Sequence, residues 1–467
     1  MEGLEVSESR LSELERTVRF DAEYFRPDFM RAAATVTAHK ARQAVNYLAH
    51  VSDGNHFSIS DDFIEEGLPY YRGQDVVGNF FVEHSSPVLI SQKTFDQPHM
   101  RRSHLKKGDV LLSIVGTIGE LSLVSSSSEA TCSCKLAILR SKEIPPEYLA
   151  TFLRSDYGRN QVQRIMRGAI QMSVLLEDMD QLQVVRFSSD FEAEIAKTVQ
   201  AARVQFDIAS ESNQHAEITL LHALGLEGWQ PPEPLTYTSS ASEAFAANRI
   251  DSDFFAPART AAIAALAALP HRLLKERCDS IREMFDPISP GEITEVRNFD
   301  ITDALKPALD DSKEPVPVEE LGSMKKLMKT GDLAVSRLRW YLKEIAVVRT
   351  TPEVPTVGSS EFIVLRPHAG VDPEVLMVFL RSFPVQTILK YCQEGNQHPR
   401  FHESNLLSIP VPDVLIENSA VITQHIRAAH TARHQARELL DRAKRAVEIA
   451  IEQGESAAML WLTKHAG

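Results

Sequence analysis

Basic side chains cluster at a few places in a chain that is acidic overall. The 467 residues carry a formal net charge of −14, and taken alone that total speaks against nucleic-acid binding. The clusters lie in residues 101–110 (RRSHLKKGDV), 151–170 and 323–350, where basic residues outnumber acidic residues. Because phosphate contacts need local Lys and Arg rather than a positive total, these clusters favour binding to DNA, although a basic run is also often just a solvated face.

Four segments hold side chains that can read the edges of base pairs. Arg and Lys suit guanine, Asn and Gln suit adenine, and Ser or Thr can serve either. The segments are 113–122 (SIVGTIGELS), 167–174 (RGAIQMSV), 336–345 (SRLRWYLKEI) and 394–401 (EGNQHPRF). Trp340 and Tyr341 could stack on bases, but packing against the core is the expectation for both. The candidate DNA-binding residues are Arg101, Arg102, Lys106, Lys107, Thr117, Arg167, Gln171, Lys325, Lys326, Arg337, Arg339, Lys343, Gln397 and Arg400.

Motifs that would make the chain an enzyme are missing from the sequence. It has no NPPY or DPPY of an amino-methyltransferase, no Gly-rich cofactor loop and no G-x-x-x-x-G-K-[ST] phosphate loop. GTIG (116–119) is typical of a turn between strands rather than of a phosphate cradle. His398 and His402 are four residues apart, but Pro399 between them forbids a regular helix. We therefore predict a binding protein with no catalytic residue, no metal and no cofactor.

The elements that position these segments occur twice along the chain. RFDAEYFRP (19–27) returns as RIDSDFFAP (249–257), KKGDVLLS (106–113) as KTGDLAVS (329–336), KLAILR (135–140) as EFIVLR (361–366), and PEYLATFLRS (146–155) as PEVLMVFLRS (373–382). Residues 71–76 align with 296–301 at nearly the same offset. Chance does not keep register across so many segments, so we infer a tandem duplication.

Each copy is expected to be an α+β domain followed by a long helix. Short apolar runs such as VLLSIV and FIVLR predict strands, and EYLATFLRSDYGRNQVQRIM predicts helix. The last part of each copy has apolar and alanine positions at the 4-3 spacing that is typical of a coiled coil. We predict that the two helices pair antiparallel; two unrelated amphipathic helices, each packed on its own domain, are the alternative. The predicted seam includes Ile195, Val199, Phe206 and Leu220, and Ile422, Ile426, Leu440 and Val447.

Length and composition are those of a globular protein with two or more domains. Hydrophobic residues make up 43% and charged residues 24% of the chain, which is ordinary for globular proteins. The sequence has no apolar run long enough to span a membrane, and the acidic N-terminus has no apolar core of a secretory signal. The four cysteines form no CxxC pair, which argues against a disulfide scaffold or structural zinc site. We expect a cytoplasmic protein.

The order of these features resembles the specificity subunit of type I restriction-modification systems. The resemblance covers nearly the whole chain and rests on the R-x-D-x-x-F/Y-F-x-P opening of each copy, on KKGDVLLSIVGTIGELSLV (106–124), on SRLRWYLKEIAVV (336–348) and on LLHALGLEGW (220–229). It implies two target-recognition domains, each of which reads one half of a split double-stranded DNA sequence. It also implies that the helices space these domains and dock two copies of an adenine-N6 methyltransferase subunit. A restriction/translocase subunit can join such an assembly, which serves phage defence, and the specificity subunit itself catalyses nothing.

The duplication and the resemblance together divide the chain into six segments. They are an N-terminal segment with the first recognition domain (1–187), a first spacer helix (188–226), a linker (227–248), the second recognition domain (249–413), a second spacer helix (414–455) and a C-terminal tail (456–467). A helix from 195 to 223 would be roughly 42 Å long at about 1.5 Å per residue. That length corresponds to about 12 base pairs of duplex DNA.

Two other classes of function stay open. A self-contained enzyme on a duplicated scaffold would show turnover by the purified chain alone, and the missing motifs speak against it. A coiled-coil scaffold that joins two proteins without touching DNA is favoured slightly by the overall acidity.

Overall fold

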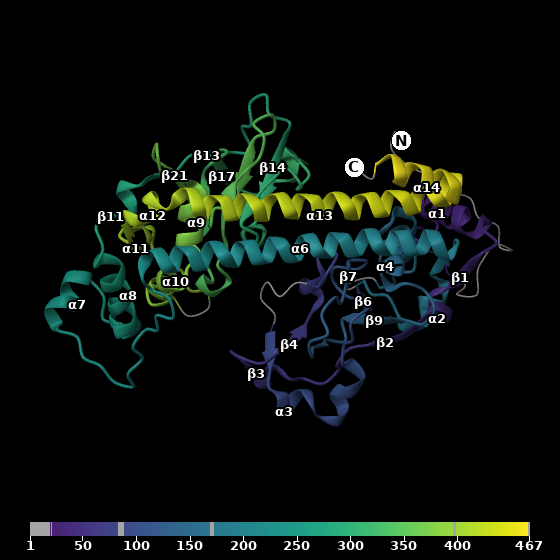
Figure 1. Cartoon of the computed structure of the whole chain (residues 1–467), viewed down its shortest axis with the longest axis horizontal. Coiled ribbons are helices and arrows are strands. Elements are labelled where there is room, and N and C mark those ends of the chain that lie inside the picture. The colour runs from purple at the N-terminus through teal and green to yellow at the C-terminus, as the bar shows by residue number, and fades with distance from the viewer. Residues whose placement is uncertain (1–18, 20, 83–87, 169–171, 396–397, 466–467) are drawn as a thin grey trace. The chain divides into compact units, whose positions relative to one another are not determined.

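The computed structural model describes residues 19, 21–82, 88–168, 172–395 and 398–465 (Figure 1). The chain forms two compact units, Met1–Asp207 with Ala432–Gly467 (unit 1) and Ile208–Thr431 (unit 2). Each unit holds an α+β domain together with part of the two long helices, α6 (Ser189–Leu224) and α13 (Ser419–Gln453). The predicted duplication of an α+β domain and a long helix is confirmed. No helix in the described ranges is long and apolar enough to cross a membrane.

Unit 1 contains two four-stranded sheets and a small strand pair. The first sheet has the order β2 (Ala49–Asp53), β9 (Leu136–Ser141), β6 (Asp109–Ser113), β7 (Leu121–Leu123), with antiparallel neighbours. The second has the order β3 (Phe63–Ile64), β5 (Val88–Ile90), β4 (Leu68–Tyr71), β8 (Thr131–Cys132), and its last pair is parallel. Strands β1 (Arg42–Ala44) and β10 (Gln183–Val185) pair antiparallel. The helices are α1 (Pro27–Ala38), α2 (Val45–Leu48), α3 (Gln92–Phe95), α4 (Pro146–Arg154), α5 (Asp156–Arg164) and, from the end of the chain, α14 (Glu455–Lys464).

The central strand β6 contains a continuous run of apolar residues because both of its faces are covered. All five of its residues are buried. Val110 and Leu112 point into the core that α4, α6 and α13 share, whereas Leu111 points into the core beside the second sheet. A strand covered on both faces loses the alternation of apolar and polar residues that marks a half-exposed strand.

Unit 2 repeats this plan with longer sheets. One sheet has the order β12 (Cys278–Ile281), β21 (Phe362–Pro367), β18 (Leu333–Ser336), β19 (Ile345–Val348), β15 (Ala308–Leu309). The other has the order β13 (Met284–Phe285), β17 (Lys325–Met328), β20 (Thr356–Gly358), β14 (Glu295–Phe299), β16 (Val316–Pro317), and β11 (His271–Leu273) pairs with β22 (Pro410–Pro412). The helices are α7 (Ala241–Ala247), α8 (Pro257–Ala267), α9 (Pro373–Arg381), α10 (Phe383–Lys390), α11 (Glu403–Leu407) and α12 (Val414–Glu417).

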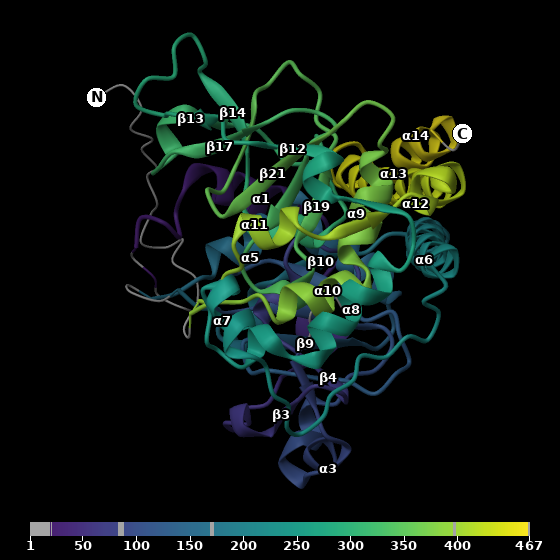
Figure 2. The same ribbon diagram turned by 90° about the vertical axis from the view of Figure 1, so that its left-hand side faces the viewer.

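The two long helices lie side by side and run antiparallel, as predicted (Figures 1 and 2). In unit 1 the N-terminal part of α6, with Ile195 and Val199, shares a buried cluster with the C-terminal part of α13, including Val447. In unit 2 Leu220 shares a cluster with Ile422 and Ile426. Phe206 and Leu440 are half-buried at the margin of the unit 1 cluster.

The small side chains of the seam are as fully buried as its large apolar ones. Ala209, Ala216, Ala436 and Ala443 are all fully buried. Alanine at these places lets two helix backbones approach closely, and the polar seam positions Asn213 and Arg433 are half-buried.

Two segments have more structure than the sequence suggested. The predicted tail contains α14, whose Ala458 and Leu462 enter the core of unit 1. Gly454, at φ 92°, separates α14 from α13 because only glycine adopts that backbone conformation without strain. The predicted linker contains α7, which a capping box between Ser240 and Glu243 starts.

Strand pairing corrects one part of the repeat alignment. Tyr71 on β4 pairs with Cys132, and Phe299 on β14 pairs with Gly358. Tyr71 therefore corresponds to Phe299 rather than to Val296, and the sequence alignment of that segment is off by three residues. The misalignment arose because the two copies differ in length between this strand and the central strand, which a gap-free reading misses.

Candidate nucleic-acid interface

The two predicted reading segments of unit 1 are joined to each other. The first follows β6, and the second follows α5. Val174 donates its backbone N–H to the carbonyl of Ile114 at 2.9 Å. Arg167 and Ser173 exchange both backbone hydrogen bonds, at 2.8 and 2.7 Å, so these two positions of the second segment lie side by side. Residues about sixty positions apart in the sequence therefore form one surface feature.

Unit 2 builds the same feature from equivalent positions. Phe401 donates its backbone N–H to the carbonyl of Arg337 at 3.2 Å, and Glu394 and Arg400 exchange hydrogen bonds at 2.8 and 2.9 Å. We call this pair of joined segments the loop pair: 114–120 with 167–173 in unit 1, and 337–344 with 394–400 in unit 2. Gln171 and Gln397, which were predicted to read bases, lie outside the described residues.

The polar side chains of the unit 1 loop pair are few. Thr117 is exposed, and its hydroxyl lies 3.2 Å from that of Ser113. Arg167 is half-buried and forms an ion pair of 2.5 Å with Asp178, whose side chain is buried. Burial raises the pKa of Asp178, and the Arg167 guanidinium opposes that rise. Arg167 is therefore partly committed to a contact inside the unit.

The loop pair of unit 2 carries two arginines on one carboxylate. Glu361 accepts from Nε of Arg337 at 2.7 Å, and from Nε and Nη2 of Arg400 at 3.1 and 2.7 Å. The hydrogen bonds from Arg400, followed by those from Arg337, lower the pKa of Glu361 to about 2 against the desolvation that opposes them. Arg337 and Arg400 each keep 42% of their side-chain surface exposed. We call this group the Arg–Glu–Arg triad.

Glu361 is absent from the residues that the sequence predicted to contact DNA. Its signal was present in the repeat alignment, where EFIVLR places Glu361 opposite Lys135 of KLAILR. A position at which two copies of one framework carry opposite charges is a candidate for a difference in ligand, and that comparison would have identified it.

Arg339 and Lys343 have backbone conformations that are unusual for their residue types. Their φ values are 48° and 51°, in the left-handed region. The equivalent positions of unit 1 are Gly116 and Gly119, with φ of 86° and 89°. Among the described residues other than glycine, only Asn248, which ends α7, is also left-handed. Unit 2 thus places two basic side chains at turns where unit 1 uses the residue that adopts them freely.

The two aromatic residues between these turns, Trp340 and Tyr341, differ in how far they are buried. Trp340 is half-buried, packs against the core of unit 2 and lies under the ammonium of Lys390. Tyr341 is 59% exposed. The expected packing therefore describes Trp340, whereas Tyr341 stands at the surface, where it could stack on a base.

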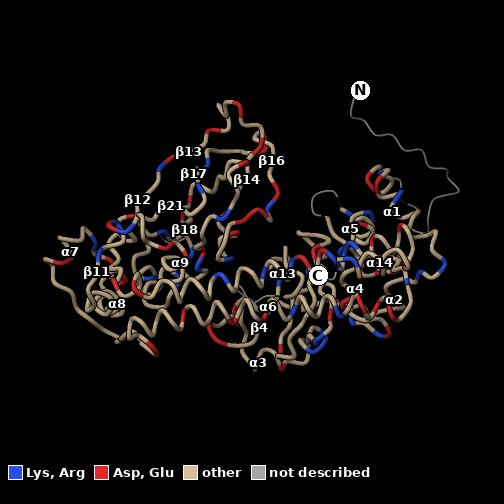
Figure 3. The backbone as a smooth tube through the Cα atoms, turned by 45° about the horizontal axis from the view of Figure 1, so that its top comes forward, with Lys and Arg blue, Asp and Glu red and all other residues tan. Residues whose placement is uncertain are grey.

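The other predicted basic residues lie at the surfaces of their own units. Arg101, Lys106 and Lys107 are exposed, and Arg102 is paired with Asp53. Lys325 and Lys326 are half-buried on β17. Figure 3 shows that Lys and Arg residues are interspersed with Asp and Glu residues along both units.

Lys326 also borders a small hollow of unit 2. The hollow has a volume of about 60 Å³ and is lined by Ser280, Arg337 and Glu403 among others. Both Lys326, a predicted DNA-binding residue, and Arg337 of the loop pair therefore line this hollow.

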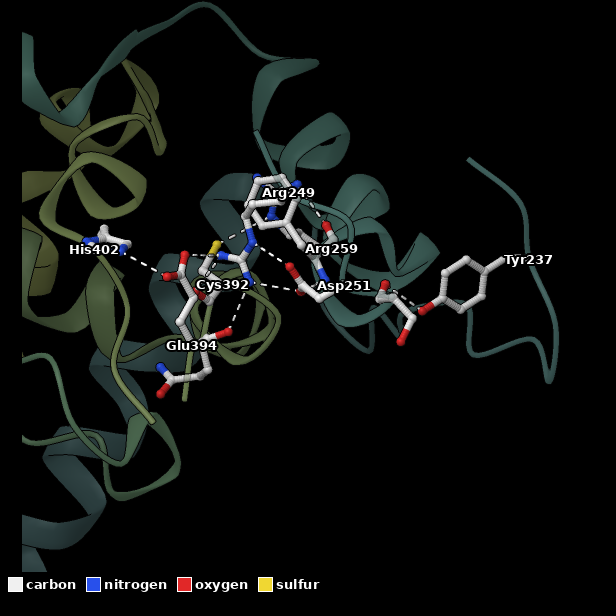
Figure 4. Close-up of polar contacts among 10 residues, drawn as sticks. Tyr237, Arg249, Asp251, Arg259, Cys392, Glu394 and His402 are labelled. Carbon is white, nitrogen blue, oxygen red and sulfur yellow. Dashed lines mark hydrogen bonds and ion pairs between the residues drawn. The ribbon is translucent and has the colours of Figure 1, made fainter. Parts of the chain in front are cut away.

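The repeated motifs at the start of each copy serve the fold. Arg249 pairs with Asp251 at 2.7 Å and donates to the carbonyl of Cys392 at 3.2 Å (Figure 4). Arg19 repeats this arrangement with Asp21 and the carbonyl of Arg164. In both units the motif therefore fastens the start of the domain to the end of the helix that precedes the second loop.

The G-D motif of the central strand is also structural. Asp109 accepts two hydrogen bonds from Arg140, at 2.8 and 2.7 Å, and Asp332 accepts two from Arg366, at 2.7 and 2.8 Å. Both carboxylates are only 1% exposed. Bidentate pairs with a buried acid fix the position of one strand relative to the next.

Within the described ranges, no three His, Cys, Asp or Glu side chains are gathered so that they could hold a metal ion. His402 instead contacts Glu394 at 3.0 Å.

Comparison with known proteins adds three solved structures. No protein-family model matches the chain, and no curated protein matches it. The chain is similar to the HsdS subunit from Thermoanaerobacter tengcongensis (16% identity, 88% of this chain and 96% of that chain, TM-score 0.30). It is similar to the type I restriction-modification system S subunit from M. genitalium (13% identity, 90% of this chain and 95% of that chain, TM-score 0.33). A third match comes from a structure described as showing complex assembly and conformational transition of the type I R-M system (16% identity, 89% of this chain and 97% of that chain, TM-score 0.29).

All three matches come from type I restriction-modification systems, and two are S subunits of the family that the sequence resembles. With identities of 13 to 16% and TM-scores near 0.3, the likeness carries neither a ligand nor a partner to this chain.

Proposed function

We propose that this chain is a DNA-binding specificity subunit that recognises a bipartite, asymmetric site and directs adenine-N6 methyltransferase subunits to it. The observation that carries the proposal is the loop pair. It occurs in both units with the same backbone hydrogen bonds, at Ile114 and Val174 in one and at Arg337 and Phe401 in the other. Its side chains differ between the two units.

A shared framework with different loops is what two readers of different half-sites require. The framework is preserved down to its ion pairs, Asp109 with Arg140 and Asp332 with Arg366. The loops carry Thr117 and Arg167 in unit 1, against Arg337, Arg339, Lys343 and Arg400 in unit 2. Two domains that present different donors and acceptors to base edges select different sequences, so the composite site is asymmetric.

Each predicted contact falls into one of two classes. Lys and Arg outside the loop pairs, such as Lys106, Lys107, Lys325 and Lys326, neutralise phosphates and fix the position of the duplex. Loop-pair side chains that keep donors or acceptors free of contacts inside the unit contact base edges, and those contacts select the sequence. The first class sets affinity and its dependence on salt, and the second sets specificity.

The chemistry belongs to partner subunits. The duplication gives the chain two equivalent sets of helix surface, which suits two copies of a methyltransferase. Each copy would rotate one adenine out of the duplex to reach its amino group. In this proposal the chain has no catalytic residue, and a restriction/translocase subunit joins the same assembly in systems that also cleave DNA.

Base-resolution mapping of methylation in the host genome, with and without this gene, tests the proposal. Loss of N6-methyladenine from one split, asymmetric motif would support it and would reveal both half-sites and the gap. Methylation that stays unchanged, in a host whose methyltransferase is shown to be active, would contradict it.

The alternative of a scaffold without DNA recognition draws on one observation, the net charge of −14. Titration of labelled duplexes with the chain and its methyltransferase separates the two ideas. A complex that assembles but binds no duplex at low salt would favour the scaffold.

A further inference from the structure

The two arginines of the Arg–Glu–Arg triad differ in how many of their side-chain nitrogens donate hydrogen bonds inside the unit. Arg400 uses Nε and Nη2 on Glu361 and donates Nη1 to the carbonyl of His398 at 3.0 Å. Arg337 donates only Nε to Glu361. Within the described part of the chain, its two terminal nitrogens donate no hydrogen bond. Arg400 is therefore consumed by contacts inside the unit, whereas Arg337 retains two adjacent donor groups.

Both ends of Arg337 are held in place. Its backbone N–H donates to the carbonyl of Glu361 at 3.2 Å, and its carbonyl accepts from Phe401 at 3.2 Å. Its guanidinium is held by the carboxylate of the same Glu361. One residue thus fixes the backbone and the side chain of Arg337 together, and a donor fork that is fixed before binding loses less conformational entropy on contact with its ligand.

The other copy of the framework isolates what the triad adds. Unit 1 keeps the backbone hydrogen bond, from Ile114 to the carbonyl of Lys135 at 3.0 Å. Ile114, Lys135 and Ser173 occupy the positions of Arg337, Glu361 and Arg400. The loop pair therefore forms without the triad. Because unit 1 joins its two loops without such a group, holding the loops together does not explain why unit 2 has two arginines and an acid at this place.

We propose that Glu361 is a positioning residue that fixes Arg337 as the guanine reader of the unit 2 half-site, with Arg400 as its brace. This inference rests on the proposed function and adds a specific base and a specific residue to it. Two adjacent guanidinium N–H groups match O6 and N7 of guanine in the major groove, a geometry that lysine cannot reproduce. Unit 1 has no counterpart of Arg337 and reads its half-site by other contacts.

The test is selection of duplexes from a randomised library by the full chain in complex with its methyltransferase, followed by binding titrations. We expect Glu361→Gln to lower the preference for guanine at one position of one half-site roughly tenfold, within the range known for a bidentate base contact. The other half-site and the gap should be unchanged. Binding to duplex of unrelated sequence should stay equal or become tighter, because a negative charge has left the interface. A residue that merely stabilised the fold would not lower specificity while preserving non-specific affinity.

Two further variants make the result decisive. Asp279→Asn removes the same charge from an exposed pair with His368 in unit 2, and it should leave the guanine preference intact. Arg337→Lys keeps the charge and loses the fork, and it should reproduce the effect of Glu361→Gln even if that variant folds poorly.

The inference would be overturned if both Glu361→Gln and Arg337→Lys, folded as judged by thermal unfolding, kept the guanine preference, or if both half-sites relaxed equally. If the wild-type complex selected no sequence at all, the proposed function itself would fail. A wild-type complex that selects a bipartite site, with variants that select the same site equally well, would remove only the role of Glu361.

Discussion

At the scale of single residues, backbone strain and positive charge coincide in the unit 2 loop. Left-handed backbone costs about 1–2 kcal/mol for an ordinary L-residue, and Arg339 and Lys343 both adopt it where unit 1 has glycine. Strain of this kind persists where the side chain serves a purpose that the backbone alone does not need. The observed outliers therefore support the prediction that these two side chains contact DNA.

Replacement of Arg339 or Lys343 by glycine should separate folding from binding. Relief of strain outweighs or balances the extra entropy of glycine in the unfolded chain, so the free energy of unfolding should stay equal or rise by up to about 1 kcal/mol. DNA affinity should fall by about 1–3 kcal/mol if the side chain reads a base. Urea denaturation and binding titrations measure the two effects. As a control, Arg31→Gly on the exposed side of α1 should cost about 1 kcal/mol of stability.

Acid should weaken the Arg–Glu–Arg triad in a defined pH range. The pKa of Glu361 is lowered from 4.5 to about 2, chiefly by the hydrogen bonds from Arg400. A carboxyl whose pKa is depressed on folding contributes stability that is fully present above its unfolded pKa and is lost as the pH falls toward the folded value. The difference in unfolding free energy between wild type and Glu361→Gln should therefore be constant near neutral pH and shrink between about pH 4.5 and 2. Denaturation series at several pH values would measure it, and a difference independent of pH would refute the assignment.

At the scale of elements, the sequence predicted what local patterns encode. The 4-3 spacing predicted that the two long helices pair, and the glycines of GTIG predicted a turn, which connects β6 and β7. The sequence could not predict the pairing of loop 114–120 with loop 167–173, because long-range backbone hydrogen bonds leave no periodic signal. The same limit concealed the contact of Arg167 with Asp178 and the triad around Glu361. Residue type suggested which side chains could read DNA. Only the structure shows which guanidinium groups keep N–H donors for a ligand and which use them inside the unit.

The buried alanines of the helix pair lead to a prediction at this scale. Ala443 in unit 1 and Ala216 in unit 2 occupy equivalent seam positions and are fully buried. A leucine at either place would overfill a closely packed seam, and each change should cost about 1–3 kcal/mol of unfolding free energy. Ala201→Leu on the exposed side of α6 is the matched control and should be nearly neutral. Equal stability of the seam and control variants would show that the two helices are not closely packed there.

At the scale of the whole molecule, helix length and loop chemistry are proposed to encode separate properties of one DNA site. The loop pairs belong entirely to their own units, and α6 and α13 are the only described helices that contribute residues to both units. The base sequence of each half-site should then depend on the loops, and the number of unread base pairs between half-sites on the helices. That separation would let one property change without the other.

Insertion of one heptad into each of α6 and α13, at equivalent positions near Asp207 and His434, tests this separation. Seven residues lengthen a helix by about 10.5 Å and bring its seam back to within about 20° of the original face. The added length corresponds to about three base pairs, so the methylated motif should keep both half-sites with a longer gap. Affinity should fall, because three base pairs turn the duplex by roughly a third of its helical repeat and present the second groove at another angle. Insertion into one helix alone should disrupt the pairing and abolish recognition. A double-insertion variant that still methylated the original gap would show that the helices do not set the spacing, and the gap would then have to be fixed by the partner subunits.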